Sequence, residues 1–190
     1  MEDIFTYYGG LVACGNLTWY AWQVWRKKIP PTSYTSWFMW LILDVLVVLT
    51  TYAAHKPIWL PLGWTVGTAF VTWALFLQGT WKWTLSDTIC AVGAVVSAVI
   101  WLTVGTTYAI IAEATSLIVA GGPLVLETAQ KPSREGMPMW SINAVACAFT
   151  LLGSDWTLGG SLVAAGSGSY SLVMIYLMLR DDVYRVMGWR

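Results

Sequence analysis

Two acidic residues stand inside long apolar stretches of the sequence. Asp44 is preceded by Leu-Ile-Leu and followed by Val-Leu-Val-Val, and Glu113 lies between Ile111 and Leu117. A charged group at membrane depth costs at least about 2.5 kcal/mol on insertion scales, so it normally faces a cavity or a polar partner. A carboxylate placed there can bind a proton, a cation or a substrate hydroxyl. We therefore predict that Asp44 binds substrate, and that Asp44 and Glu113 serve proton coupling.

Both carboxylates also have a purely structural interpretation. Asp44 would hydrogen-bond a Ser, Thr or Trp on a neighbouring helix and so fix the packing. Glu113 would be satisfied within its own helix by Thr115 or Ser116, or would lie near the outer surface. The sequence leaves these alternatives open.

Two asparagines and two tryptophans could complete a polar site. Asn16 and Asn143 stand on otherwise apolar faces, and their amides supply both donors and acceptors. Trp40 and Trp140 head helices at equivalent places and could stack on a sugar ring or a cation. We predict that these four residues bind substrate together with Asp44. Helix packing for the asparagines and interfacial anchoring for the tryptophans are the alternatives.

The sequence contains no recognisable catalytic or cofactor apparatus. His55 is the only histidine, there is no Ser/His/Asp set, and no phosphate-binding glycine loop precedes a helix. Cys14, Cys90 and Cys147 each fall in an apolar stretch and are interpreted as packing residues. We expect a protein that is not an enzyme and that holds neither a metal nor a cofactor.

These residues must be positioned by helices that cross a membrane. The chain of 190 residues is 57% hydrophobic and 11% charged, with a mean hydropathy of +0.63, whereas a soluble domain has roughly 25% charged residues. Crossing the bilayer as a helix takes about 20 apolar residues. Seven stretches qualify: 8–25, 37–54, 59–78, 88–103, 107–127, 139–154 and 158–179. Only Val104-Gly105-Thr106 divides the fourth from the fifth, so a tight turn is required there.

The basic residues predict the orientation of the chain. With seven spans, nine of the ten Lys and Arg residues fall on one side: Arg26, Lys27, Lys28, Lys82, Lys131, Arg134, Arg180, Arg185 and Arg190. Lys56 alone falls on the other. The positive-inside rule then places the N-terminus outside and the C-terminus in the cytoplasm. Membrane lipid is an expected partner, whereas a net charge of zero gives no indication of nucleic acid.

Two loops on the basic side are similar to each other. Residues 26–33 and 130–136 both combine lysine, proline and serine, and each leads into an aromatic helix start. This repeat suggests three helices, one linking helix and three more. The linking helix is needed because two parallel units must begin on the same side of the membrane. The predicted boundaries are 1–83, 84–105 and 106–190.

Motifs in the second half carry a family resemblance. They are Pro123-Leu124, the run Ser133-Arg134-Glu135-Gly136-Met137-Pro138, and Gly166, Leu172 and Tyr176 before Arg180. In these residues the sequence resembles the SWEET sugar transporters and the wider PQ-loop (MtN3/saliva-like) family. The resemblance implies seven helices in 3+1+3 order, a sugar substrate and alternating access. Pro123 and Pro138 are expected to permit the helix bends that gating requires.

The sequence therefore predicts an all-α integral membrane protein that moves a small polar solute by alternating access. The resemblance implies that this solute is a sugar. One alternative is a proton-coupled amino-acid or vitamin-precursor carrier of the PQ-loop class. Another is a non-transporting membrane subunit of a larger complex. The expected partners are lipid and a small-molecule solute, and a homo-oligomer is an open option.

Overall fold

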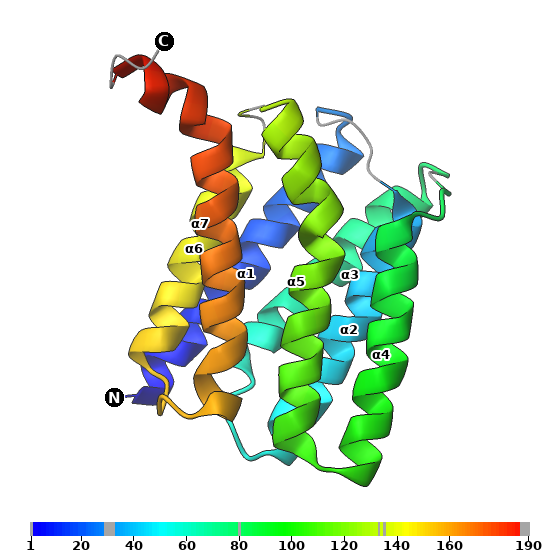
Figure 1. Cartoon of the computed structure of the whole chain (residues 1–190), viewed down its shortest axis with the longest axis vertical. Helices are drawn as coiled ribbons and strands as arrows, with labels where there is room; N and C mark the ends of the chain where they lie inside the picture. Colours follow the sequence, from blue (N-terminus) through cyan, green and yellow to red (C-terminus); the bar gives the residue numbers. More distant parts are fainter. Residues whose placement is uncertain (1, 29–32, 80, 133, 135, 187–190) are drawn as a thin grey trace.

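The computed structural model describes residues 2–28, 33–79, 81–132, 134 and 136–186, and side chains among residues 4–180. The described residues form seven α-helices joined by turns (Figure 1). The helices are α1 (Glu2–Trp25), α2 (Tyr34–Ala53), α3 (Trp59–Phe76), α4 (Leu85–Thr103), α5 (Thr106–Gln130), α6 (Met137–Leu152) and α7 (Leu158–Val186). Each of the seven predicted stretches overlaps one of these helices, so the predicted helix count is confirmed.

Most of the helices are suited to a lipid environment. Five of them, α2, α3, α4, α5 and α7, are long and apolar enough to cross a bilayer. Helix α6 is apolar but has only 16 residues. Helix α1 has 24 residues, but its many Trp, Tyr and Gly residues contribute little hydropathy. Large apolar side chains such as Phe70, Val95 and Leu102 are exposed on the bundle surface. These features indicate an all-α integral membrane protein.

The boundary between α4 and α5 falls at Gly105, where the sequence requires a turn. Gly105 has a φ of 127°, a conformation that residues with a Cβ rarely adopt. Helix α4 begins at Leu85, three residues before the predicted stretch. A capping box explains the earlier start, because the Thr84 hydroxyl accepts from the Asp87 N–H and the Asp87 carboxylate accepts from the Thr84 N–H.

Consecutive helices run in opposite directions, so the connections fall alternately at the two ends of the bundle (Figure 1). The end that contains the N-terminus, here the N-terminal end, also carries Lys56 after α2. The opposite, C-terminal end carries the basic residues that follow α1, α3 and α5: Arg26, Lys27, Lys28, Lys82, Lys131 and Arg134. That the C-terminal end faces the cytoplasm stays a prediction.

Parts of the predicted loops and motifs lie outside the described residues. These are residues 29–32 of the first loop, Ser133 and Glu135 of the family motif, and Arg190. Arg185 is described in its backbone only.

We name helices α1, α2 and α3 the first trio and helices α5, α6 and α7 the second trio. Helix α3 packs against both α1 and α2, and α7 packs against both α5 and α6. The trios meet where α1 contacts α6 and where α2 contacts α5, and α4 lies against α2 and α5. Within the first trio, the backbones of α1 and α3 approach so closely that a Cβ added to Gly63 would overlap the Gly10 carbonyl oxygen.

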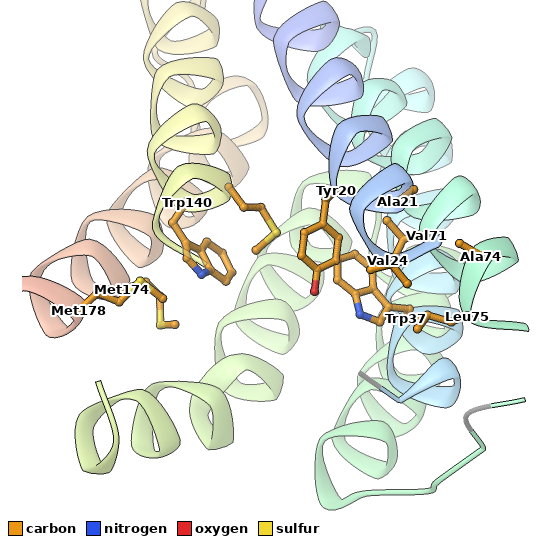
Figure 2. Packing of buried hydrophobic residues seen from close by; sticks show 11 residues of the cluster. Tyr20, Ala21, Val24, Trp37, Val71, Ala74, Leu75, Trp140, Met174 and Met178 are labelled. Carbon is orange, nitrogen blue, oxygen red and sulfur yellow. The ribbon is translucent and has the colours of Figure 1, made fainter. Parts of the chain in front are cut away.

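The largest buried cluster lies toward the C-terminal end and draws on both trios (Figure 2). Tyr20 of α1 stacks on Trp37 of α2, with 5.4 Å between ring centroids. Trp140 of α6 and Met174 and Met178 of α7 belong to the same cluster. Lipid tails are as apolar as these side chains, so close contact rather than escape from water holds the cluster together.

Candidate functional site

A cavity of about 110 Å³ lies at mid-depth between the two trios. One water molecule requires roughly 10–15 Å³ of cavity volume, so this cavity can hold several waters or a small solute. Its walls come from every helix except α4 and are formed by Asn16, Leu17, Trp37, Trp40, Asp44, Trp64, Thr68, Ala114, Leu117, Ile118, Gly121, Met139, Trp140, Asn143, Val163, Gly166, Ser167 and Tyr170. The cavity brings together all five predicted substrate-binding residues, which come from α1, α2 and α6.

Asp44 is held in the cavity wall by α3. The Thr68 hydroxyl donates to Asp44 Oδ2 at 2.8 Å, and the aspartate is only 6% exposed. Within the described part of the chain, no hydrogen bond reaches Asp44 Oδ1. The interhelical bond agrees with the structural interpretation of Asp44, while the second oxygen is available to a ligand.

Asn143 is the centre of a hydrogen-bond network that joins α3, α6 and α7. Trp64 Nε1 donates to Asn143 Oδ1 at 2.9 Å. Asn143 Nδ2 lies 3.1 Å from Ser167 Oγ and 2.9 Å from Ser171 Oγ. The amide therefore has internal partners for both its donor and its acceptor side, which fixes its orientation.

Asn16 has one satisfied and one unsatisfied end. Its Nδ2 donates to the Met139 carbonyl of α6 at 2.9 Å, which links α1 to the second trio. Its Oδ1 is buried without a hydrogen-bond partner, and the residue is 3% exposed. The carbonyl of Met139 settles which end of the amide carries the NH₂ group, since an oxygen there would face another oxygen.

Aromatic rings form much of the wall. Trp37 and Trp40 of α2 are 5.5 Å apart between ring centroids, and Trp140 meets Tyr170 edge-on at 5.3 Å. Trp140 is thus buried in the bundle, and Trp40 is half-buried beside the same cavity. Trp37, Trp64 and Tyr170 also line the cavity and were not predicted from the sequence as site residues. The position of Trp64 could have been recognised from the sequence, because it lies inside its helix and shares a face with the polar residue Thr68.

Glu113 lies outside the cavity wall and pairs with another helix. It is fully buried, and the Thr50 hydroxyl of α2 lies 2.8 Å from Glu113 Oε2. Thr115 and Ser116 instead donate to carbonyls of their own helix, at 2.8 and 2.7 Å. The alternatives of a local partner or a surface position for Glu113 are therefore wrong. Glu113 Oε1 is buried without a partner.

The Thr50 hydroxyl can serve Glu113 in either protonation state. Its oxygen also lies 3.0 Å from the Leu46 carbonyl and 3.2 Å from the Val47 carbonyl. The single hydroxyl hydrogen can go to an ionised Glu113. Alternatively, a protonated Glu113 can donate to Thr50, and Thr50 then donates to Leu46.

The two prolines expected to act in gating occupy different helical settings. Pro123 is inside α5, where it removes a backbone donor from the helix. Hydroxyls of neighbouring helices donate to the carbonyls there, Ser86 to Ala120 at 2.6 Å and Tyr170 to Gly121 at 2.9 Å. Pro138 is in the first turn of α6, a position that proline tolerates without a bend.

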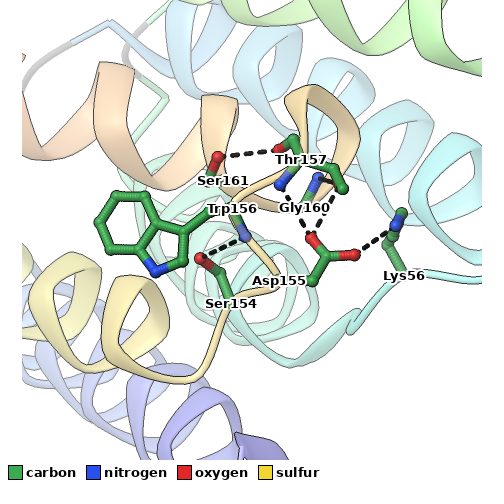
Figure 3. A network of polar contacts seen from close by, with 7 residues as sticks. All are labelled: Lys56, Ser154, Asp155, Trp156, Thr157, Gly160 and Ser161. Carbon is green, nitrogen blue, oxygen red and sulfur yellow. Dashed lines mark hydrogen bonds and ion pairs between the residues drawn. The ribbon is translucent and has the colours of Figure 1, made fainter.

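At the N-terminal end, Lys56 forms an ion pair with Asp155 that joins the α2–α3 and α6–α7 connections (Figure 3). Asp155 Oδ1 also accepts from the Thr157 hydroxyl at 2.7 Å and from the Thr157 N–H at 3.1 Å. These hydrogen bonds, that of Lys56 first, lower the pKa of Asp155 from 3.8 to about 2. The pair connects the two trios at the end opposite the largest buried cluster, which contains Trp37 and Trp140.

Models of protein families, curated proteins and solved structures show no match to this chain. The resemblance to the SWEET and PQ-loop transporters therefore stays an expectation that rests on the residues quoted for it. No group of three or more His, Cys, Asp or Glu residues in the described ranges could hold a metal ion. The chemistry of the site must be argued from the cavity itself.

Proposed function

We propose that the protein is a membrane transporter that moves a small polar solute by alternating access. The observation that carries the proposal is the mid-depth cavity between two helix trios, with Asp44, Asn16 and Asn143 buried in its wall. Buried polar residues are costly in a membrane, and in transporters they mark the substrate pathway. Binding near the midplane, at the interface of two repeats, is the common plan of secondary transporters.

The packing pattern supports a 3+1+3 organisation, with units 1–83 and 106–190 and a linking helix between them. The third helix of each trio is central, α3 in the first and α7 in the second. The bridging contacts also correspond, because exchanging the trios converts the α1–α6 pair into the α5–α2 pair. Such a pseudo-twofold relation lets one trio rock against the other around a fixed site.

Opposite ends of the cavity have different closing contacts. Toward the C-terminal end, the cluster around Trp37 and Trp140 packs the trios together. Toward the N-terminal end, the same trios are joined by the close packing of Gly9 on α6, by the buried hydrogen bond between Thr50 and Glu113, and by the pair of Lys56 and Asp155. Alternating access would require these contacts to break in turn, with Pro123 as the flexible point of α5.

Uptake into proteoliposomes tests this proposal. The panel should contain radiolabelled monosaccharides, amino acids and organic amines, since sugar is supported by resemblance alone. We expect at least one solute to enter faster than in protein-free vesicles. Ser167→Phe, which fills the cavity, should abolish that flux, whereas Ser169→Phe on the exposed face of the same helix should not.

Two outcomes would contradict transport. If no solute of the panel moves faster than in protein-free vesicles, the transporter proposal fails. If a solute raises the melting temperature but never crosses the membrane, the chain is a binding subunit, which is the non-transporting alternative.

A further inference from the structure

Within the proposed transporter, we infer that the cavity accepts a small organic cation, an amine without a carboxylate, with Asp44 as its counter-charge. Among the described residues that line the cavity, Asp44 is the only charged one, and none is Lys, Arg or His. An anion would meet a carboxylate and no compensating cation. The inference rests on the proposed function in one respect only, that the cavity is where the solute binds.

The hydrogen-bond donors of the wall are largely used within the protein. Thr68 donates to Asp44, and Trp64 donates to Asn143. Asn143 in turn donates to the serines of α7, and the Asn16 amide donates to Met139. A solute carboxylate or phosphate would need these donors, because its oxygens only accept hydrogen bonds.

One further wall donor is engaged and another is not. The Tyr170 hydroxyl donates to the Gly121 carbonyl at 2.9 Å. The Trp40 indole N–H lies beside the Cys90 thiol of α4 but is buried without a hydrogen-bond partner. An indole N–H carries no charge, so it does not supply the cation that a solute carboxylate or phosphate would need beside Asp44.

Two acceptor oxygens of the wall, one of them on a carboxylate, have no hydrogen-bond partner. Asn16 Oδ1 is buried without a partner, and no hydrogen bond from a described residue reaches Asp44 Oδ1. An ammonium group has donors and no acceptors, so it matches these two oxygens. A sugar hydroxyl is a poorer match, because it is satisfied only when it both donates and accepts.

The aromatic wall suits the same class of ligand. Rings of Trp37, Trp40, Trp64, Trp140 and Tyr170 surround the space. The face of an indole attracts a cation, and most strongly where water is excluded. At about 10–15 Å³ for each water-sized group, a volume of about 110 Å³ has room for a small amine.

Thermal unfolding of the purified protein at constant ionic strength tests the inference. The cationic probes are ethanolamine, choline and tetramethylammonium, and glucose, glycine and acetate are the comparison solutes. We expect at least one cationic probe to raise the melting temperature in a saturable way, and the three comparison solutes to leave it unchanged. Asp44→Asn should weaken binding of the active probe at least tenfold.

Three variants separate a binding role of Asp44 from a folding role. Asp44→Glu keeps the charge and should restore part of the affinity. Trp40→Leu keeps the carboxylate but removes an aromatic wall, and should weaken the quaternary probes several-fold. Glu127→Gln removes an exposed carboxylate of α5 outside the cavity wall and should leave the affinity unchanged.

The outcomes distinguish this inference from the proposed function. Saturable binding and flux of a neutral or zwitterionic solute, lost in Ser167→Phe, would overturn the cation assignment and leave transport standing. Equal probe affinity in wild type, Asp44→Asn and Glu127→Gln would also overturn it. Absence of flux for every solute overturns the transporter itself.

Discussion

At the scale of single residues, two buried carboxylates connect α2 to its neighbours. Asp44 bonds Thr68 within the first trio, and Glu113 bonds Thr50 between the trios. Each carboxylate accepts a hydrogen bond from a threonine hydroxyl, a short side-chain donor that leaves the helices in close contact. The first pair faces the cavity and the second is fully enclosed, so we expect the first to act in binding and the second in packing or proton coupling.

Replacing Thr50 by Val tests the enclosed pair. The variant keeps the shape of the side chain but leaves the buried Glu113 carboxyl without its partner. Loss of a partner for a buried polar group costs about 1–3 kcal/mol, so the protein should unfold at a clearly lower temperature in detergent. Thr115→Val is the matched control, because its exposed hydroxyl bonds only its own helix. Equal melting temperatures for the two variants would show that the pair contributes no stability.

The ion pair of Lys56 and Asp155 predicts a pH dependence. Because the folded-state pKa of Asp155 is lowered to about 2, its carboxylate stabilises the folded protein above about pH 4 and loses this effect as the pH falls through 2. The melting temperature of wild type should exceed that of Lys56→Gln by a constant amount between pH 5 and 8. The difference should shrink below pH 4. A difference that grows on acidification would contradict the assignment.

At the scale of helices, close backbone approach determines which pairs form. Helices α1 and α3 touch through Gly10 and Gly63, and Leu17 packs over Gly67. Small residues allow such contact between membrane helices, and van der Waals packing then replaces the hydrophobic driving force. A glycine also allows close contact between α4 and α5, where a Cβ on Gly93 would overlap Ser116 Oγ.

Gly63→Ala should therefore destabilise the first trio. The new methyl would collide with backbone atoms of Gly10, which cannot move as a flexible side chain can. Overpacking of this kind costs typically about 1–3 kcal/mol. Gly15→Ala is the control, since a Cβ there meets no atom within 4 Å. It should be neutral or slightly stabilising, because Ala favours the helix. Denaturation in mixed micelles of both variants measures the difference.

At the scale of the whole molecule, the charge distribution and the helix directions agree. The described basic loop residues lie at the C-terminal end, apart from Lys56. We expect that end to face the cytoplasm by the positive-inside rule. In the proposed alternating-access cycle, the cavity would open to one compartment at a time, and the Lys56 pair would lie on the outer side.

Cysteine labelling in intact cells tests the orientation. In a background with Cys14, Cys90 and Cys147 replaced by Ala, Lys56→Cys should react with a membrane-impermeant maleimide from outside. Lys131→Cys should react only after the cells are permeabilised. The reverse pattern would invert the topology while leaving the fold unchanged.

The sequence by itself determined the seven helices and the turn at Gly105, because lipid forces each segment to satisfy its backbone locally. It also singled out Asp44, Asn16 and Asn143 as polar residues at membrane depth, and the structure places them around one cavity. The start of α4 at Leu85 was not predicted, because the stretch was bounded by its apolar residues and the capping box of Thr84 and Asp87 is polar.

Only the tertiary structure decided which helices are neighbours. It paired Glu113 with Thr50, 63 positions away, and Asn143 with Trp64, 79 positions away. It also brought Lys56 to Asp155 across 99 positions. Such pairs depend on how each helix is rotated and placed in the bundle, and no local pattern of apolar residues encodes that. For the same physical reason, the sequence could not show that Asn16 Oδ1 and Asp44 Oδ1 lack hydrogen-bond partners in the cavity. The inferred cationic ligand therefore depends on the tertiary structure.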